Sequence, residues 1–153
     1  MLAVIARMRF SLLILSVWLV AGCSKDDARL QGTWRSNREA TVAAAFERDP
    51  RWTNATPEKV ERFRDMFGQM TLTYAKGVVT SSYRSEVGSF RYRVVERGTN
   101  FVVIRTDGGL DEGRNIKMRF VDGDKAYWID SGPLSEGLQE RFDRVTTVKG
   151  VQK

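Results

Sequence analysis

The side chains that carry most protein chemistry are scarce in this chain, which has one cysteine, Cys23, and no histidine. The sequence therefore has no imidazole base, no disulfide and no zinc site built from Cys and His. Carboxylate pairs remain, Asp111 with Glu112 and Asp122 with Asp124, but both stand in turn-like stretches where solvated acids are usual. We therefore expect no enzymatic activity, no catalytic residue, no metal site and no cofactor.

Cys23 directly follows an apolar segment. Arg7 and Arg9 precede this segment, which runs over residues 10–20 and so has 11 residues. At about 1.5 Å per residue it is too short to cross a hydrocarbon core of roughly 30 Å, and lengthening it toward the N-terminus would bring the two arginines into the bilayer. Its length is typical of the apolar region of a secretion signal.

The four residues at the end of this segment, Val20-Ala21-Gly22-Cys23, resemble the lipobox of bacterial lipoproteins: an aliphatic residue, a small residue, Gly or Ala, then Cys. The resemblance implies signal cleavage between Gly22 and Cys23, a diacylglyceryl thioether on Cys23, and acylation of the new amino group by a chain such as palmitate. Two or three acyl chains make membrane attachment stable. If the source is a Gram-negative bacterium, Ser24 after the lipidated cysteine implies the outer membrane, with the protein facing the periplasm.

Removal of residues 1–22 leaves 153 − 22 = 131 residues, enough for one domain. We divide the chain into a signal peptide (1–22), a lipidated tether (23–29), a barrel domain (30–148) and a tail (149–153). Two of the 25 basic residues lie in the signal, so the mature chain has 23 basic and 19 acidic side chains, scattered along it. We expect no nucleic-acid partner and a monomer.

From residue 69 onward, apolar and polar residues alternate, which predicts strands. Turn signals at residues 76–77, 98–100, 107–109, 122–124 and 131–133 separate them. The predicted strands cover residues 70–74, 78–83, 90–94, 101–106, 116–120, 126–129 and 140–148. With a first strand at Trp34 this gives eight, and we predict a mainly β fold, an antiparallel up-and-down barrel, which closes such a set without exposed edges.

The pattern between residues 36 and 68 is helical. Ser36 and Glu39 have capping-box spacing for a short helix that Asp49-Pro50 would end. A first strand that continues through residues 41 and 42 is the alternative.

A second helix is predicted from Thr56-Pro57 to Gly68. Its apolar face carries Val60, Phe63, Met66 and Phe67. This face either packs against the sheet or covers the mouth of the barrel as a lid.

The motif Leu30-x-Gly32-x-Trp34 resembles the opening motif of the lipocalins and the wider calycin group, in which Gly-x-Trp begins the first barrel strand. In those families a basic residue of the last strand packs across the Trp, a cation–π contact worth about 0.5–2 kcal/mol. Arg144, in Phe142-Asp143-Arg144, is the matching residue here. The resemblance implies a lipocalin-like barrel closed by the structural pair Trp34 and Arg144; the alternative is a core Trp and an unrelated surface Arg. The predicted helices depart from the short connection that is usual after the first strand.

The interior of an eight-stranded barrel is either filled by side chains or holds one small ligand. The side chains expected to point inward are Met70, Leu72, Tyr74, Phe90, Tyr92, Met118, Phe120 and Trp128. Among them, Tyr74, Tyr92 and Trp128 have polar tips to which the polar group of a ligand could bind.

Two functions follow as hypotheses. The first is a lipid-anchored, non-enzymatic envelope protein whose barrel binds a small apolar or amphipathic ligand. The second is an envelope protein-interaction or inhibitor module that acts through the barrel surface. On that surface Arg84, Arg91, Arg93, Lys117 and Arg119 form either a basic patch or a solvated face balanced by acids such as Glu86 and Glu96.

Overall fold

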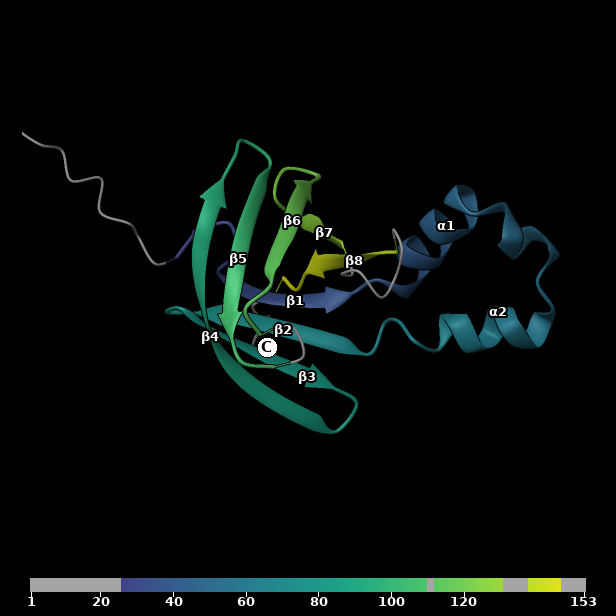
Figure 1. Ribbon diagram of the computed structural model, residues 1–153, viewed down its shortest axis with the longest axis horizontal. Helices are drawn as coiled ribbons and strands as arrows, with labels where there is room; N and C mark the ends of the chain where they lie inside the picture. Colours follow the sequence, from purple (N-terminus) through teal and green to yellow (C-terminus); the bar gives the residue numbers. More distant parts are fainter. Residues whose placement is uncertain (1–25, 110–111, 131–137, 147–153) are drawn as a thin grey trace, which may run out of the picture.

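Eight antiparallel strands form the body of the protein. The structure, a computed structural model, describes residues 26–109, 112–130 and 138–146. Each strand pairs with the next along the chain, and the last pairs with the first, so the barrel is closed (Figure 1). The strands are β1 (Gly32–Ser36), β2 (Met70–Ala75), β3 (Val78–Tyr83), β4 (Glu86–Arg97), β5 (Phe101–Asp107), β6 (Asn115–Val121), β7 (Ala126–Asp130) and β8 (Gln139–Arg144). The predicted eight-stranded up-and-down barrel is confirmed.

The connection from β1 to β2 contains α1 (Arg38–Arg48), a 3₁₀ helix η1 (Pro50–Asn54) and α2 (Pro57–Arg64). Figure 1 shows these helices beyond one end of the barrel. Thr56 caps α2 and Pro57 takes its first position, where a missing N–H costs no helical hydrogen bond. The two helices predicted after the first strand are therefore present.

The start of α1 differs from the prediction. Asn37 caps the helix, with its side-chain oxygen accepting from the Ala40 backbone N–H at 2.9 Å. Ser36 is instead the last residue of β1, and its hydroxyl accepts from the Gly68 backbone N–H, so the predicted capping box of Ser36 and Glu39 is wrong. The alternative of a strand continuing through residues 41 and 42 is also wrong, since both lie in α1.

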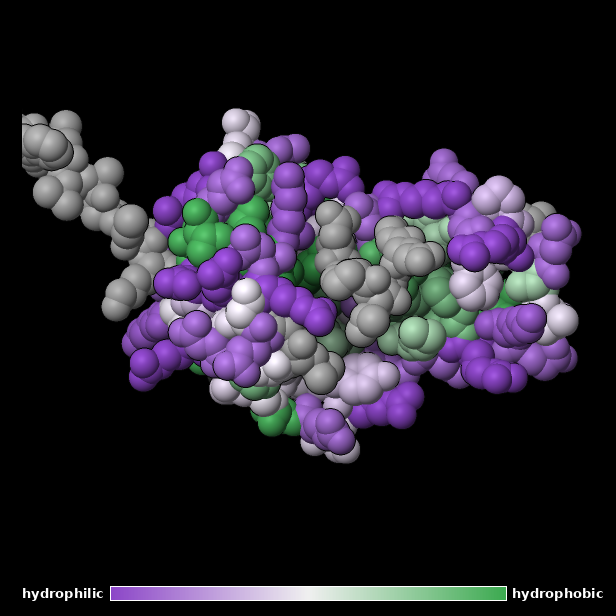
Figure 2. Space-filling model, in the orientation of Figure 1, coloured by the Kyte–Doolittle hydropathy of each residue, from purple (hydrophilic) through white to green (hydrophobic). Residues whose placement is uncertain are grey.

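The helices share a small apolar cluster of their own. Val42, Phe63 and Phe67 are buried in it, and the rings of Phe46 and Trp52 stack with centroids 5.6 Å apart. Figure 2 shows the apolar side chains between the two helices and hydrophilic ones on their outer sides. The predicted packing of the α2 face against the sheet or over the mouth is wrong, because this face is buried mainly by α1 and η1. The regular helix ends at Arg64, one turn before Gly68, which leaves Met66 57% exposed.

Inward-facing side chains from all eight strands form the barrel core. Trp34, Tyr127 and Phe142 are its largest fully buried members, and Tyr127 packs against both of the others, with ring centroids 4.5 and 5.5 Å away. The predicted alternation of β2, β4 and β6 is confirmed. Within the described ranges, no helix is long and apolar enough to cross a membrane.

The predicted inward position of Trp128 is wrong. Residues 122–125 form the turn, Val121 pairs with Ala126, and Phe120 therefore pairs with Tyr127 across β6 and β7. This register places Tyr127 inside the barrel and Trp128 on the outer surface. There the guanidinium groups of Arg48 and Arg141 each lie 6.0 Å from the Trp128 ring.

Candidate functional site

One end of the barrel is filled by residues 26–31, which precede β1; we call it the closed end. Leu30 is fully buried there, and its carbonyl accepts a 2.7 Å hydrogen bond from Nε1 of Trp34. A turn in which the Leu30 backbone N–H donates to the Asp27 carbonyl holds the segment in place. The Leu30-x-Gly32-x-Trp34 motif is thus a unit that fills this end.

An ion-pair network ties the same segment to the loop between β4 and β5. Arg29 donates to both carboxylate oxygens of Asp27, which is 8% exposed, and its Nη1 donates to the backbone carbonyls of Gly98 and Thr99. The hydrogen bond from Arg29 holds the pKa of the Asp27 carboxyl below its ordinary value, against the opposing effect of burial. Residues 26–29, assigned to the tether from the sequence, are therefore packed on the barrel.

The structure brings together Trp34 and Arg144, the two residues paired in the sequence comparison. They lie opposite each other on β1 and β8, and the Arg144 guanidinium carbon is 4.2 Å from the centre of the Trp34 ring. Gly32 makes room for this contact, because a Cβ on Gly32 would lie 3.2 Å from Nη1 of Arg144. Its φ of +115° also disfavours any other residue.

The other end of the barrel, where β1 leads into α1, is its mouth. Several inward-facing apolar side chains here are only partly buried. Met70, Phe90, Ile116 and Ile129 form this wall, with the Phe90 ring under Gly108 and Gly109 at the end of β5. Their exposed apolar surface makes the inner wall of the mouth the part of the barrel that could contact a ligand.

A carboxyl group stands on the same inner wall. Glu140 is paired with Ile129 across β7 and β8, and its Oε1 accepts a 2.5 Å hydrogen bond from the Ser36 hydroxyl. Burial raises the pKa of Glu140, and the hydrogen bond from Ser36 opposes this shift only in part. The apolar setting of Glu140 therefore disfavours the charged form of its carboxyl group. We call Met70, Phe90, Ile116, Ile129 and Glu140 the mouth site.

Two phenols lie deeper inside. The Tyr74 hydroxyl donates to Sδ of Met118 at 3.7 Å, whereas the fully buried Tyr127 hydroxyl has no hydrogen-bond partner among the residues that the structure describes. Burial raises the pKa of both, and the nearby Tyr74 adds to the increase for Tyr127, although no hydrogen bond of good geometry joins them. This hydroxyl lies below the mouth site and could form a hydrogen bond with a bound molecule.

The three predicted ligand-lining residues are thus only partly brought together. The rings of Tyr74 and Tyr92 meet edge to face with centroids 5.4 Å apart. The Tyr92 hydroxyl accepts from Gln31 at the closed end, and burial, together with the nearby Asp26 carboxylate, raises its pKa to about 12. Trp128 lies outside the barrel.

The sequence interpretation missed Tyr127 and Glu140. A turn of residues 122–125 would have placed Tyr127 opposite Phe120, so the length of the hairpin loop was the available signal. Glu140 alternates with Phe142 along β8 and therefore shares its inward face, but a carboxylate at an inward position breaks the apolar pattern.

A surface groove of about 200 Å³ lies on the helices, outside the barrel. It is lined by Arg38, Glu39, Val42, Ala43, Phe46 and Arg64. Val42 and Phe46, which belong to the helical cluster, line its apolar part. Nε of Arg38 donates a hydrogen bond to the Phe67 carbonyl. The groove is thus separate from the mouth site.

The mouth site has the features of a site that could bind a small molecule. The described ranges contain no group of three or more His, Cys, Asp or Glu side chains that could hold a metal ion. An apolar wall with one carboxyl group and deeper phenols suits a small molecule with an apolar body and one polar group.

No protein-family model, curated protein or solved structure matches the chain. The lipobox residues Val20 to Cys23, and Ser24 after them, lie outside the described residues. Lipid attachment and a relationship to lipocalins therefore stay predictions from the sequence.

Proposed function

We propose that this chain is a non-enzymatic lipoprotein of the cell envelope, attached through Cys23 to the outer membrane and facing the periplasm, whose lipocalin-like barrel binds a small amphipathic molecule at the mouth site. The observation that carries the proposal is the half-buried apolar wall beside Glu140, with the unpartnered Tyr127 hydroxyl beneath it. Leaving a buried polar group unpaired costs about 1–3 kcal/mol, which a ligand group that reached the hydroxyl would offset.

The filled closed end limits the size of such a ligand. Three fully buried side chains occupy the interior on the side of the closed end: Trp34, Phe142 and Leu30. The apolar body of the ligand would contact Met70, Phe90, Ile116 and Ile129, and its polar group would hydrogen-bond with Glu140 or a phenol. A fatty acid or a similar single-chain amphiphile has this chemistry.

Binding is tested with an environment-sensitive fluorescent fatty acid titrated into the purified chain. Ile129→Trp would fill the mouth and is expected to weaken binding at least about tenfold, the equivalent of 1.4 kcal/mol. Val87→Trp is the matched control, because Val87 is 70% exposed and faces outward on β4. Saturable binding that is equal in both variants would place the ligand elsewhere, and absence of binding would contradict the carrier function.

The anchor is tested separately by metabolic labelling with palmitate and by the mass of the N-terminal peptide. Label on the wild-type chain and none on Cys23→Ser, with release of the variant from the membrane fraction, is the expected outcome. A wild-type chain that retains an unmodified Cys23 would remove the anchor from the proposal without affecting the mouth site.

A second candidate function is an interaction or inhibitor module that acts through the barrel surface. The filling of the barrel core by buried side chains from all eight strands favours it, because such a core serves packing alone. Crosslinking in intact cells would identify a protein neighbour, whereas recovery of the chain without any neighbour would count against this function.

A further inference from the structure

The outer surface of β4, β5 and β6 gathers basic side chains. Arg93 of β4 lies directly opposite Arg105 of β5, with both side chains on the outer face. Lys117 and Arg119 continue the group on β6, opposite Val103 and Phe101. Like charges directly across a strand pair destabilise a sheet. We call Arg93, Arg105, Lys117 and Arg119 the cationic face.

Among the residues that the structure describes, none of the four forms an ion pair. Arg105 donates to the neutral side chain of Asn115 at 3.0 Å, and Arg119 donates to that of Gln139 at 3.3 Å. The positive charge of the face is therefore available to an external anion.

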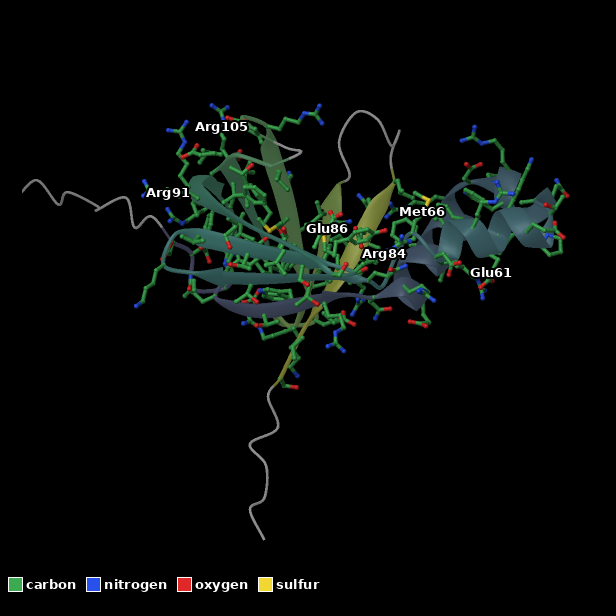
Figure 3. The ribbon with its side chains drawn as sticks, turned by 90° about the horizontal axis from the view of Figure 1, so that it is seen from below. Glu61, Met66, Arg84, Glu86, Arg91 and Arg105 are labelled. Atoms are coloured by element: carbon green, nitrogen blue, oxygen red, sulfur yellow. The ribbon has the colours of Figure 1, made fainter. Side chains whose placement is uncertain are left out.

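Two acidic residues border the cationic face and offset part of its charge, and one further arginine adds to it. Arg91 adds a further positive charge but is opposite Asp107, and Glu96 stands opposite Val103 near the closed end. Figure 3 shows Arg91 and Arg105 projecting from the barrel on the side remote from Glu61 and the helices. Arg105 of the cationic face thus lies on a side of the barrel away from the helical cluster.

An aromatic residue accompanies the charges. The ammonium nitrogen of Lys117 lies 4.3 Å from the centre of the Phe101 ring, which is partly exposed. Aromatic rings next to basic side chains suit the boundary between lipid headgroups and acyl chains.

The position of the anchor favours a membrane as the occupant. Nη2 of Arg97, the last residue of β4, donates to the Asp26 carbonyl at 3.2 Å, so the chain reaches the barrel beside the strand that carries Arg93. Cys23 is three residues before Asp26, and an extended chain spans at most about 3.6 Å per residue. A lipidated Cys23 would therefore lie within about 11 Å of this edge of the barrel.

We propose that the cationic face rests on anionic phospholipid headgroups of the membrane to which Cys23 is attached, so that the barrel lies on its side. This inference depends on the proposed anchor for its geometry. Each basic residue near an anionic surface strengthens binding about fivefold, and salt screens the effect. An acidic protein is the other partner that the charge would suit, and the experiment separates the two.

The test uses the full lipidated chain in vesicles of phosphatidylcholine, with or without phosphatidylglycerol. Acylated Cys23 carries no free thiol, so Asn115→Cys provides a single labelling site within the cationic face, and Glu61→Cys provides one on α2. A fluorophore at position 115 is expected to be quenched by headgroup-labelled lipid only in phosphatidylglycerol vesicles and at low salt. A fluorophore at position 61 is expected to be unaffected.

Two triple variants test the role of charge: one removes charges from the cationic face, and its control removes the same number from α2. In R93Q/R105Q/K117Q we expect fewer molecules with the cationic face on the membrane. The ratio of molecules whose face contacts the membrane to those whose face does not is expected to fall about fivefold per charge, roughly a hundredfold in total. It removes like-charge repulsion, so its melting temperature is expected to equal or exceed that of the wild type. K59Q/R62Q/R64Q removes three exposed charges from α2 and is expected to leave quenching unchanged.

Three results would overturn the inference. The first is equal quenching in both vesicle types, and the second is an equal loss of quenching at position 115 in both triple variants. The third is a specific crosslink from position 115 to an acidic protein in cells. The mass of the Cys23 peptide, measured on the same sample, separates these results from failure of the anchor. If Cys23 is unmodified, flotation of the unlipidated chain with phosphatidylglycerol vesicles still tests the face. In that case, loss of flotation only in R93Q/R105Q/K117Q would support the proposed role of the cationic face. A wild-type chain that does not float with the vesicles would contradict it.

Discussion

The guanidinium of Arg144 covers the ring of Trp34 at 4.2 Å and at the same time donates to the backbone carbonyls of Gln31 and Arg29 at 2.6 and 2.5 Å. One side chain thus joins the last strand, the first strand and the segment that fills the closed end. Since β8 pairs only with β7 and β1, this contact stabilises the closure of the barrel.

We expect Arg144→Ala to lower the free energy of unfolding by about 2–4 kcal/mol, through the loss of charge-assisted hydrogen bonds and of the cation–π contact. Arg144→Lys is expected to recover little, because an ammonium cannot reach two carbonyls with the planar geometry of a guanidinium. Urea denaturation followed by tryptophan fluorescence measures both. Arg35→Ala, an exposed neighbour on β1, is the control and is expected to change stability by less than about 0.5 kcal/mol.

The unpartnered hydroxyl of Tyr127 leads to the opposite effect. Tyr127→Phe is expected to raise the free energy of unfolding by about 1 kcal/mol, because it removes a buried polar group that has no hydrogen bond. If the hydroxyl contacts a ligand, the same variant is expected to bind the fluorescent fatty acid more weakly. A variant that is less stable than the wild type without ligand would show that the hydroxyl has a partner, such as an internal water.

The Asp27 carboxylate is expected to stabilise the closed end in a pH-dependent way. Its pKa is lowered in the folded state by Arg29, so its stabilisation is present above the ordinary pKa of an aspartate and is lost as the pH falls through the lowered pKa. Asp27→Asn is expected to cost about 1.5–3 kcal/mol at pH 7. Melting curves from pH 7 downward should converge for the two proteins in acid, and a constant difference would contradict the ion-pair explanation.

Glu140 is expected to show the reverse dependence. Burial raises its folded-state pKa, so the folded state binds a proton more tightly than the unfolded state, and stability falls as the pH rises from the ordinary value to the raised one. Glu140→Gln keeps an oxygen acceptor for Ser36 and avoids the charge. The variant is expected to melt at a higher temperature than the wild type at pH 7 and at a similar temperature at pH 4; a variant less stable at pH 7 would contradict this.

Local patterns predicted the barrel well, because each strand is short and its turn residues are strong signals. Lys76 and Gly77 both have positive φ in the turn between β2 and β3, and Asp122 and Gly123 do so in the turn between β6 and β7. The error at Trp128 arose where turn length decides the register. A turn one residue longer moved Tyr127 to the inside, since a shift of one residue exchanges the two faces of a strand.

The two helices after β1 were predicted correctly, but the surface that buries the apolar face of α2 was not. Phe63 and Phe67 are buried as expected, but their partners Phe46 and Trp52 belong to the same insertion. An amphipathic pattern indicates that a face will be buried and does not identify the surface that covers it.

The sequence by itself determined the features that depend on neighbouring residues: the apolar segment that precedes Cys23, the order of the strands, and the pattern of inward side chains on β2, β4 and β6. Only the tertiary structure placed Arg29 on the carbonyls of Gly98 and Thr99, Glu140 next to Ser36, and Arg93 opposite Arg105. The reason is distance along the chain. The closure of β8 on β1 brings together residues more than 100 positions apart, such as Ser36 and Glu140, and no local pattern carries that information.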